Sequence, residues 1–240
     1  MEWKDWYLDI IIVPSGFMIF VGYHLWLWHR VRSQPLTTII GRNARGRRFW
    51  VSAIMKDNDK KNILAIQTLR NAIMGSTLMA TTSILLCAGL AAFLSSTYSI
   101  KKPLNDTVYG AHSEFMLSLK FVTMLLVFIF SFVSHSLSIR FTNQVNFLIN
   151  CPCSEDRLGQ TTMQEYVSEL LERGFWLAAV GNRLFYAAVP LLLWIFGPLL
   201  VFLCYVVVVI VLYKLDFVFV EDSKVEGEIS SVRKLTIYAE

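Results

Sequence analysis

The sequence predicts an all-α membrane protein, a bundle of four transmembrane helices in which the second and third helices extend into the cytosol. Composition is the first reason: apolar residues make up 55% of the 240 residues and charged residues only 17%. Soluble domains carry about 25% charged residues. The second reason is placement, because nearly all charges fall in short blocks between four long apolar stretches. Each stretch reaches the length of about 20 residues that a helix needs to cross a bilayer.

We expect the four spans at residues 8–28, 72–98, 115–139 and 184–212. The first follows an acidic leader, residues 1–9, and ends in tryptophan, histidine and arginine rather than in a small-residue cleavage site. It therefore lacks the features of a cleavable signal peptide and is expected to remain as a span. The fourth is the most apolar, and Pro190 and the Gly197-Pro198 pair predict kinks within it.

The connecting segments are partly helical. A helical pattern runs unbroken from Lys60 through the second span, which makes that helix roughly 58 Å long, so part of it must project from the membrane. The pattern of the third span continues to Asn150, before Pro152 stops it. Thr162 and Glu165 have the spacing of a capping box. They predict the start of a short cytoplasmic amphipathic helix ahead of the fourth span.

The distribution of basic residues predicts the orientation. Residues 30–71 hold ten basic and two acidic residues, whereas residues 140–183 hold four basic and five acidic ones. Short loops rich in lysine and arginine remain cytoplasmic. We therefore place the loops 29–71 and 140–183 in the cytosol. Four spans then put both termini, including the tail 213–240, on the outer or lumenal side, in a plasma membrane or endomembrane that the sequence does not distinguish.

Several motifs resemble the plant branch of the membrane family called domain of unknown function 599. The segments that carry the resemblance are Ile40-Gly41-Arg42, Lys56-Asp57-Asn58-Asp59-Lys60-Lys61, Gln67-Thr68-Leu69-Arg70-Asn71, Gly181-Asn182-Arg183-Leu184-Phe185-Tyr186 and Leu191-Leu192-Leu193-Trp194-Ile195-Phe196-Gly197-Pro198. The resemblance extends over about residues 5–220. It implies a four-pass plant membrane protein and implies no activity.

Polar residues of the third span are the first candidates for function. Lys120 is the only basic residue within the predicted spans, and ionisable groups there are costly and often functional. The alternative is that its ammonium group snorkels to the outer surface. Ser131 and His135, with Ser138 and Thr142, follow on one helical face. This face would either line an aqueous path or form hydrogen bonds between packed helices.

Arginines at the inner ends of the spans are a second group of candidates. Arg70, Arg140 and Arg183 lie at the inner ends of spans two, three and four. If the helices converge there, the guanidinium groups could hold a phosphate or carboxylate, or select anions in a pore. Anchoring in lipid headgroups by the same residues is the more common arrangement.

The first loop contains a concentrated basic stretch. Arg42, Arg45, Arg47 and Arg48 are candidates for binding anionic lipid headgroups, besides fixing the orientation of the chain. Cys151 and Cys153 are candidates for acylation close to the membrane. No enzyme motif is present, and we expect no catalytic residue, no metal site, no cofactor and no nucleic-acid partner.

These features favour a small channel or transporter that works as a homo-oligomer, because four helices enclose too little polar surface for a wide path. Anions are the preferred solute, since the only charge of the third span is positive. The alternative is a non-transporting membrane scaffold or lipid-binding regulator that recruits a cytosolic partner. An intramembrane enzyme is a third alternative, which lacks a supporting motif.

Overall fold

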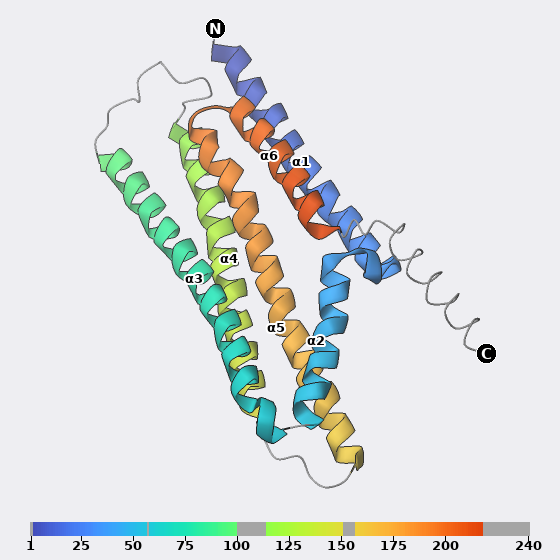
Figure 1. Cartoon of the computed structure of the whole chain (residues 1–240). Coiled ribbons are helices and arrows are strands. Elements are labelled where there is room, and N and C mark those ends of the chain that lie inside the picture. Colours follow the sequence, from blue (N-terminus) through green and yellow to red (C-terminus); the bar gives the residue numbers. More distant parts are fainter. Residues whose placement is uncertain (1, 57, 100–113, 151–156, 218–240) are drawn as a thin grey trace, which may run out of the picture.

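The computed structural model describes residues 2–56, 58–99, 114–150 and 157–217 (Figure 1). Within these ranges every regular element is helical, apart from one isolated bridge between Thr38 and Phe217, so the predicted all-α fold is confirmed. The elements are α1 (Glu2–Ser33), η1 (Pro35–Thr37), α2 (Ile39–Lys56), α3 (Asn58–Ser99), α4 (Glu114–Leu148), α5 (Arg157–Leu192), η2 (Leu193–Ile195) and α6 (Pro198–Asp216). Cys151, Cys153 and most of the tail lie outside the described residues.

Among the described residues, five helices are long and apolar enough to cross a membrane, where we expected four spans. They are Asp9–Ser33, Ile63–Ser96, Leu117–Leu148, Thr162–Ile195 and Pro198–Asp216. The difference arises because the stretch 184–212, predicted as one span, is divided at Gly197. The φ angle of Gly197 is 151°, a conformation open to glycine but rarely to other residues. Pro198 then starts α6 without an amide hydrogen, and the chain reverses so that α6 runs back beside α1 (Figure 1).

A second difference concerns the segment before this turn. The predicted amphipathic helix and the first part of the predicted fourth span form one continuous helix, α5, which begins five residues before the Thr162 capping sequence. Its glycines do not break it because they pack tightly against α4. A Cβ at Gly174 would lie 3.0 Å from Thr142 Oγ1, and one at Gly181 would lie 2.6 Å from His135 Cδ2. This packing offsets the low helix propensity of glycine.

The basic stretch also differs from its expected form, because it lies within a helix, α2. Val51, Ile54 and Met55 recur on one side of α2 and are buried against the neighbouring helices. This apolar face is short, and it lies at the end of the helix away from the arginines. The first half of α2 is rich in arginine and glycine and did not predict a helix. Packing of its second half against the neighbouring helices therefore explains why α2 forms.

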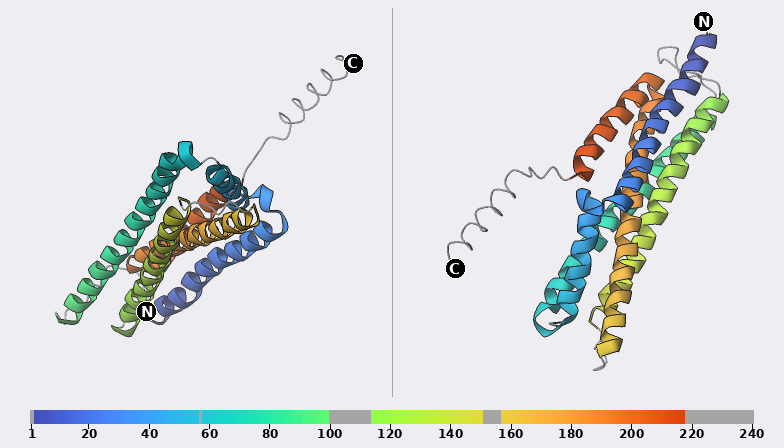
Figure 2. Two further views of the ribbon diagram at one scale, coloured as in Figure 1. Left: turned by 90° about the horizontal axis from the view of Figure 1, so that it is seen from below. Right: turned by 90° about the vertical axis from the view of Figure 1, so that its right-hand side faces the viewer.

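The helices form an elongated bundle with two parts (Figures 1 and 2). We call the part that contains α1 and α6 the upper bundle; there these two helices pack on each other and lie against α4, α5 and η2. Its core residues are Val13, Phe20, Tyr23, Leu27, Phe121, Met124, Ala187, Leu191, Trp194, Val201, Tyr205 and Leu212. α3 borders this part through its contact with α4.

Where α1 and α6 end, α2 continues along the bundle in their place (Figure 1). We call this part the lower bundle; it contains α2, the first half of α3, the last part of α4 and the first half of α5. It has its own apolar core, formed by Val51, Ile54, Met55, Ala65, Leu69, Val145, Ile149, Val167, Leu170 and Leu171. The helices α3, α4 and α5 connect these two cores, and between themselves they bury a third, smaller cluster formed by Cys87, Phe128 and Ala188.

Candidate functional site

Lys120 lies inside the upper bundle and pairs with Asp9 of α1. Its Nζ is 3.1 Å from Asp9 Oδ2, and the two side chains are only 5% and 0% exposed. The indole Nε1 of Trp194, in η2, donates to Asp9 Oδ1 at 3.1 Å, and the Lys120 Nζ lies 5.3 Å from the centre of the indole ring. The helices α1, α4 and η2 therefore meet at this ion pair. Its charges cancel and the carboxylate has further hydrogen bonding, which offsets the cost of burying the two charges.

The Asp9 partnership was missed at the sequence level, where this residue was assigned to the acidic leader. In the structure Asp9 lies inside α1 and is 1% exposed. Lys120 accordingly does not snorkel to the membrane surface, and its positive charge does not face an open path. A carboxylate at the start of an apolar stretch, together with a lone lysine in another stretch, is the signal that could have identified the pair.

A second, partly buried ion pair lies towards the other end of the upper bundle. Arg183 of α5 donates to one carboxylate oxygen of Asp216, the last residue of α6, and Tyr23 of α1 donates to the other. One guanidinium nitrogen of Arg183, Nη1, is buried without a hydrogen-bond partner. Neighbouring His24 interacts through Nδ1 with the carbonyl oxygen of Phe20 at 2.8 Å. The ion pair with Arg183 and the hydrogen bond from Tyr23 together hold the end of α6 against α5 and α1.

The polar face of α4 forms the contact between α4 and α5. Ser131, His135, Ser138 and Thr142 are all buried, between 0% and 4% exposed. Ser131 donates to the carbonyl oxygen of Gly181 at 2.9 Å and contacts Ser83 of α3 at 3.3 Å. The imidazole of His135 lies against Gly181, and neither of its nitrogens has a hydrogen-bond partner. These side chains are covered by neighbouring helices and do not line a water-filled path.

The three arginines predicted at the inner span ends have different surroundings. Arg70 on α3 and Arg140 on α4 are exposed. Arg183 is largely buried against Asp216, with 19% of its side chain exposed. The structure therefore does not bring the three guanidinium groups into one shared cavity.

The arginines of the basic stretch also divide into two kinds. Arg47 makes a bidentate pair with Glu172 of α5, in which both N–O distances are 2.8 Å, and its guanidinium carbon lies 4.6 Å from the centre of the Phe175 ring. Arg42, Arg45 and Arg48 are exposed. Arg47 therefore joins α2 to α5, whereas the other three arginines face outwards.

Aromatic side chains surround the end of α1. The Arg30 guanidinium lies over the Trp26 ring and that of Arg32 over the Trp28 ring, at 5.9 Å and 4.6 Å from the ring centres. Trp28 also meets Trp176 of α5 edge to face, with 6.5 Å between the ring centres. Tryptophans are enriched at membrane–water interfaces, so this level fits one boundary of the bilayer.

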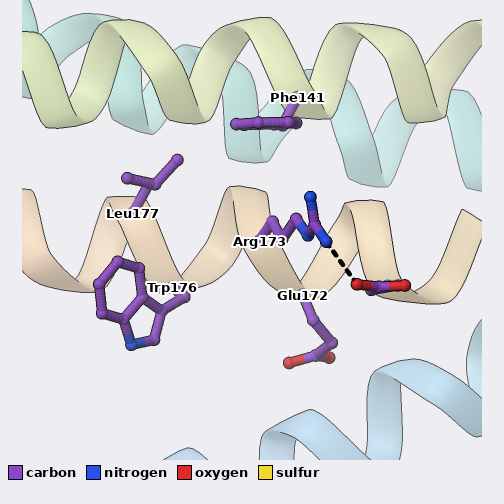
Figure 3. A pocket seen from close by; sticks show the side chains of 6 residues that line it. Phe141, Glu172, Arg173, Trp176 and Leu177 are labelled. Atoms are coloured by element: carbon purple, nitrogen blue, oxygen red, sulfur yellow. Dashed lines mark hydrogen bonds and ion pairs between the residues drawn. The ribbon is translucent and has the colours of Figure 1, made fainter.

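A shallow groove of about 420 Å³ lies close to this level, between α4 and α5 (Figure 3). Phe141 and Leu177 give it an apolar wall, and Trp176 stands at its edge. Arg173 and Glu169, which form an ion pair of 2.6 Å, give it a polar rim (Figure 3). Such a groove suits contact with an amphipathic surface better than the enclosure of a small solute.

Together, the fold and these contacts define an all-helical, multi-pass membrane protein whose buried charges are paired. Residues 11–220 match the family described as "Protein of unknown function, DUF599". The chain belongs to that family, so the family predicted from the motifs is confirmed, whereas its plant branch stays a prediction. No curated protein and no solved structure matches the chain.

Proposed function

We propose that this protein is a non-transporting, non-enzymatic membrane scaffold. In this proposal the upper bundle anchors the chain in the bilayer. The lower bundle stands at the cytosolic surface, where it presents a docking face to a soluble protein. The observation that carries the proposal is the internal pairing of charge in the upper bundle, in which Lys120 faces Asp9 and Arg183 faces Asp216. A single chain of this kind offers a solute no unpaired lysine within its core.

The sealed polar face of α4 supports the same conclusion. A transport path needs polar groups that water and solute can reach. Here Ser131 and His135 are 0% and 1% exposed, and the glycines of α5 bring the two helices into close contact over them. Small residues and hydroxyl groups at such contacts are typical of helix packing in membranes.

The lower bundle has the properties expected of a docking platform. Its apolar core is separate from that of the upper bundle. Large apolar side chains nevertheless remain exposed on it, including Phe49 of α2, Ile63 of α3 and Phe147 of α4, which are 70%, 75% and 75% exposed. If this part lies in water, exposed apolar groups of that size mark a surface for a protein partner.

We infer a different orientation if all five candidate helices cross the membrane. The basic residues of the segment 30–71 still favour the cytosolic side for the lower bundle. The N-terminus is then outside or lumenal, as first expected. If α6 crosses the membrane as a separate span, as its length and apolarity allow, its last residue, Asp216, lies on the cytosolic side.

Flux measurements and partner labelling test the proposal together. Liposomes that contain the purified protein should show no more chloride or nitrate flux than empty liposomes, beside an active anion channel as the positive control. In cells, proximity labelling from the lower bundle should detect a soluble protein that is lost from the Phe49→Ser/Phe147→Ser variant. A matched Met18→Ser/Leu85→Ser variant, altered at exposed positions of the upper bundle, should retain it. Robust anion flux, or equal labelling by both variants, would refute the scaffold.

A homo-oligomeric anion channel is the second candidate, and one observation favours it. On α3, a Cβ added at Gly75 or Gly89 would meet no neighbour within 4 Å, so small residues are exposed where a second copy could approach closely. A path between copies would avoid the sealed interior, and the exposed Arg70 and Arg140 could face it. A defined oligomer by light scattering, with anion flux that Arg140→Gln abolishes, would favour the channel over the scaffold.

A further inference from the structure

The turn between α1 and α2 is tightly built. Thr38 Oγ1 donates to the carbonyl oxygen of Pro35 and accepts from the amide of Gly41, at 3.0 Å and 3.2 Å. A Cβ at Gly41 would lie 2.1 Å from the same carbonyl oxygen, so only glycine fits there. The Nε of Arg42 donates to the carbonyl oxygen of Leu36 at 2.6 Å, which fixes the arginine across the turn. The position of its guanidinium group is therefore set by the fold.

The chain on both sides of this turn is rich in positive charge. Residues 29–56 contain seven lysines and arginines and no aspartate or glutamate. Arg47 is neutralised by Glu172 from α5, which removes it from the set predicted at the sequence level. Arg32, Arg42 and Arg45 are exposed, and Arg30 is partly so. We call these four arginines the basic corner.

The basic corner lies at the level where a membrane surface is expected. Two of its arginines stack on Trp26 and Trp28, the kind of residue enriched at the bilayer interface. Leu36 and Ile39, in and just after the turn, are 45% and 36% exposed. Apolar groups that can enter the interface therefore stand beside guanidinium groups that can bind phosphate.

We propose that the basic corner binds the headgroup phosphates of anionic membrane lipids. Arg42 would provide a fixed guanidinium group, while Arg32 and Arg45 approach the phosphates from the neighbouring turns of α1 and α2. The proposal rests on the cytosolic placement given above but not on the scaffold role. The proposal also changes the set of lipid-binding arginines expected from the sequence. Arg30 and Arg32 are added and Arg47 is removed. Arg48 is also left out, because it lies one helical turn beyond Arg45, further from the end of α1.

The membrane orientation of the chain does not by itself require the arginines of the basic corner to be held in place. Retention of a loop in the cytosol depends on the number of lysines and arginines near the span ends, not on how their side chains are held. The bond from Arg42 to Leu36 and the two arginine–tryptophan stacks are extra features, and they pre-position the charges. Pre-positioning lowers the entropy that is lost when a ligand binds.

Native mass spectrometry of the full-length protein in detergent tests the proposal directly, with dioleoyl phosphatidic acid and dioleoyl phosphatidylcholine as probes. The corner variant carries Arg32→Gln, Arg42→Gln and Arg45→Gln. A matched control removes the same charge at three exposed arginines elsewhere, with Arg70→Gln, Arg140→Gln and Arg173→Gln. Each basic residue contributes about fivefold to such binding, so the corner variant should bind phosphatidic acid on the order of 100-fold more weakly. The control should stay within about threefold of the wild type.

Because Arg42 is part of the turn, a second variant protects the test against misfolding. Arg32→Gln/Arg45→Gln leaves the bond to Leu36 in place and should weaken binding by about 25-fold. Millimolar inorganic phosphate should not displace the lipid. Equal affinity of the wild type for both lipids, equal losses in the corner and control variants, or displacement by inorganic phosphate would each overturn the proposal. The assay requires neither a partner nor a bilayer, so its failure is distinct from failure of the scaffold.

Discussion

The upper and lower bundles use the same three long helices but are held together in different ways. The upper bundle contains the buried ion pair of Lys120 with Asp9, the partly buried ion pair of Arg183 with Asp216, and a buried polar face on α4. The core of the lower bundle consists of apolar side chains, and its ion pair between Arg47 and Glu172 lies near the surface, with about a fifth of each side chain exposed. The most deeply buried polar contacts are therefore concentrated in the upper bundle.

The proposed placement, with the upper bundle in the bilayer and the lower bundle in water, would account for this contrast. Around the upper bundle, outward side chains such as Met18, Leu25 and Leu85 are as apolar as the core, at 65% to 68% exposure. Burial of apolar surface then provides little preference for one helix arrangement, whereas polar contacts are specific. In water, burial of apolar surface alone stabilises a core. The charges of the upper bundle therefore specify which helices pair, and this view can be tested by substitution.

The largest effect is expected at Lys120. Lys120→Gln removes the cation that faces the buried Asp9 carboxylate, so the free energy of unfolding should fall by about 3–5 kcal/mol. The Asp9→Asn/Lys120→Gln variant, which removes both charges, should recover most of that loss. Denaturant titration of the detergent-solubilised protein, followed by circular dichroism, measures both values. A double variant no more stable than Lys120→Gln would show that the pair does not specify the upper bundle.

Leu171→Ala should have the next largest effect, and its effect should be local. Leu171 is 1% exposed in the lower core, and removal of such a side chain costs about 2–5 kcal/mol. Hydrogen–deuterium exchange should increase in peptides of α2, while peptides of α1 and α6 keep their protection. An equal increase in both parts would mean that the two cores unfold as one unit.

A smaller effect is expected for Gly181→Ala. The new methyl group would press on the His135 ring, and overpacking of this kind costs about 1–3 kcal/mol. Gly89→Ala provides the matched control, because a Cβ there meets nothing within 4 Å. Its midpoint temperature should not fall, whereas that of Gly181→Ala should. Recovery in Gly181→Ala/His135→Ala would identify the imidazole as the obstacle, and a loss unchanged by His135→Ala would contradict this reason.

The smallest effect is expected for the ion pair of the lower bundle. Arg47→Gln removes a bidentate but partly solvated contact, so the unfolding free energy should fall by about 1 kcal/mol or less. The difference from the wild type should shrink further in high salt, because solvent-exposed charges are screened. A loss as large as that of Lys120→Gln would remove the contrast between the two parts.

The sequence predicted the helical class and the apolar stretches, because these follow from local periodicity and length. It did not predict the reversal at Gly197. A glycine–proline pair is compatible with a kink, and hydropathy is the same whether the chain continues or turns back. The turn is favoured by the contact of α6 with α1, between residues far apart in the sequence.

The sequence identified the polar residues of the candidate site but not the residues that they contact. Lys120, Ser131 and His135 stood out because polar groups are rare in spans. Their surroundings depend on residues distant in the sequence: Asp9 for Lys120, and Gly181 for Ser131 and His135. A single sequence shows which groups need partners, but only the fold shows whether a neighbouring helix or water provides them.

The side of the membrane on which three positions lie provides the most direct test of the five-span arrangement. A membrane-impermeant thiol reagent would be applied to intact cells that carry single-cysteine variants at Glu2, Phe49 and Glu240 in the plasma membrane, with the native cysteines replaced by serine. We expect labelling at position 2 only, with positions 49 and 240 labelled after permeabilisation. Labelling of positions 2 and 240 together in intact cells would indicate an even number of crossings and contradict α6 as a separate span.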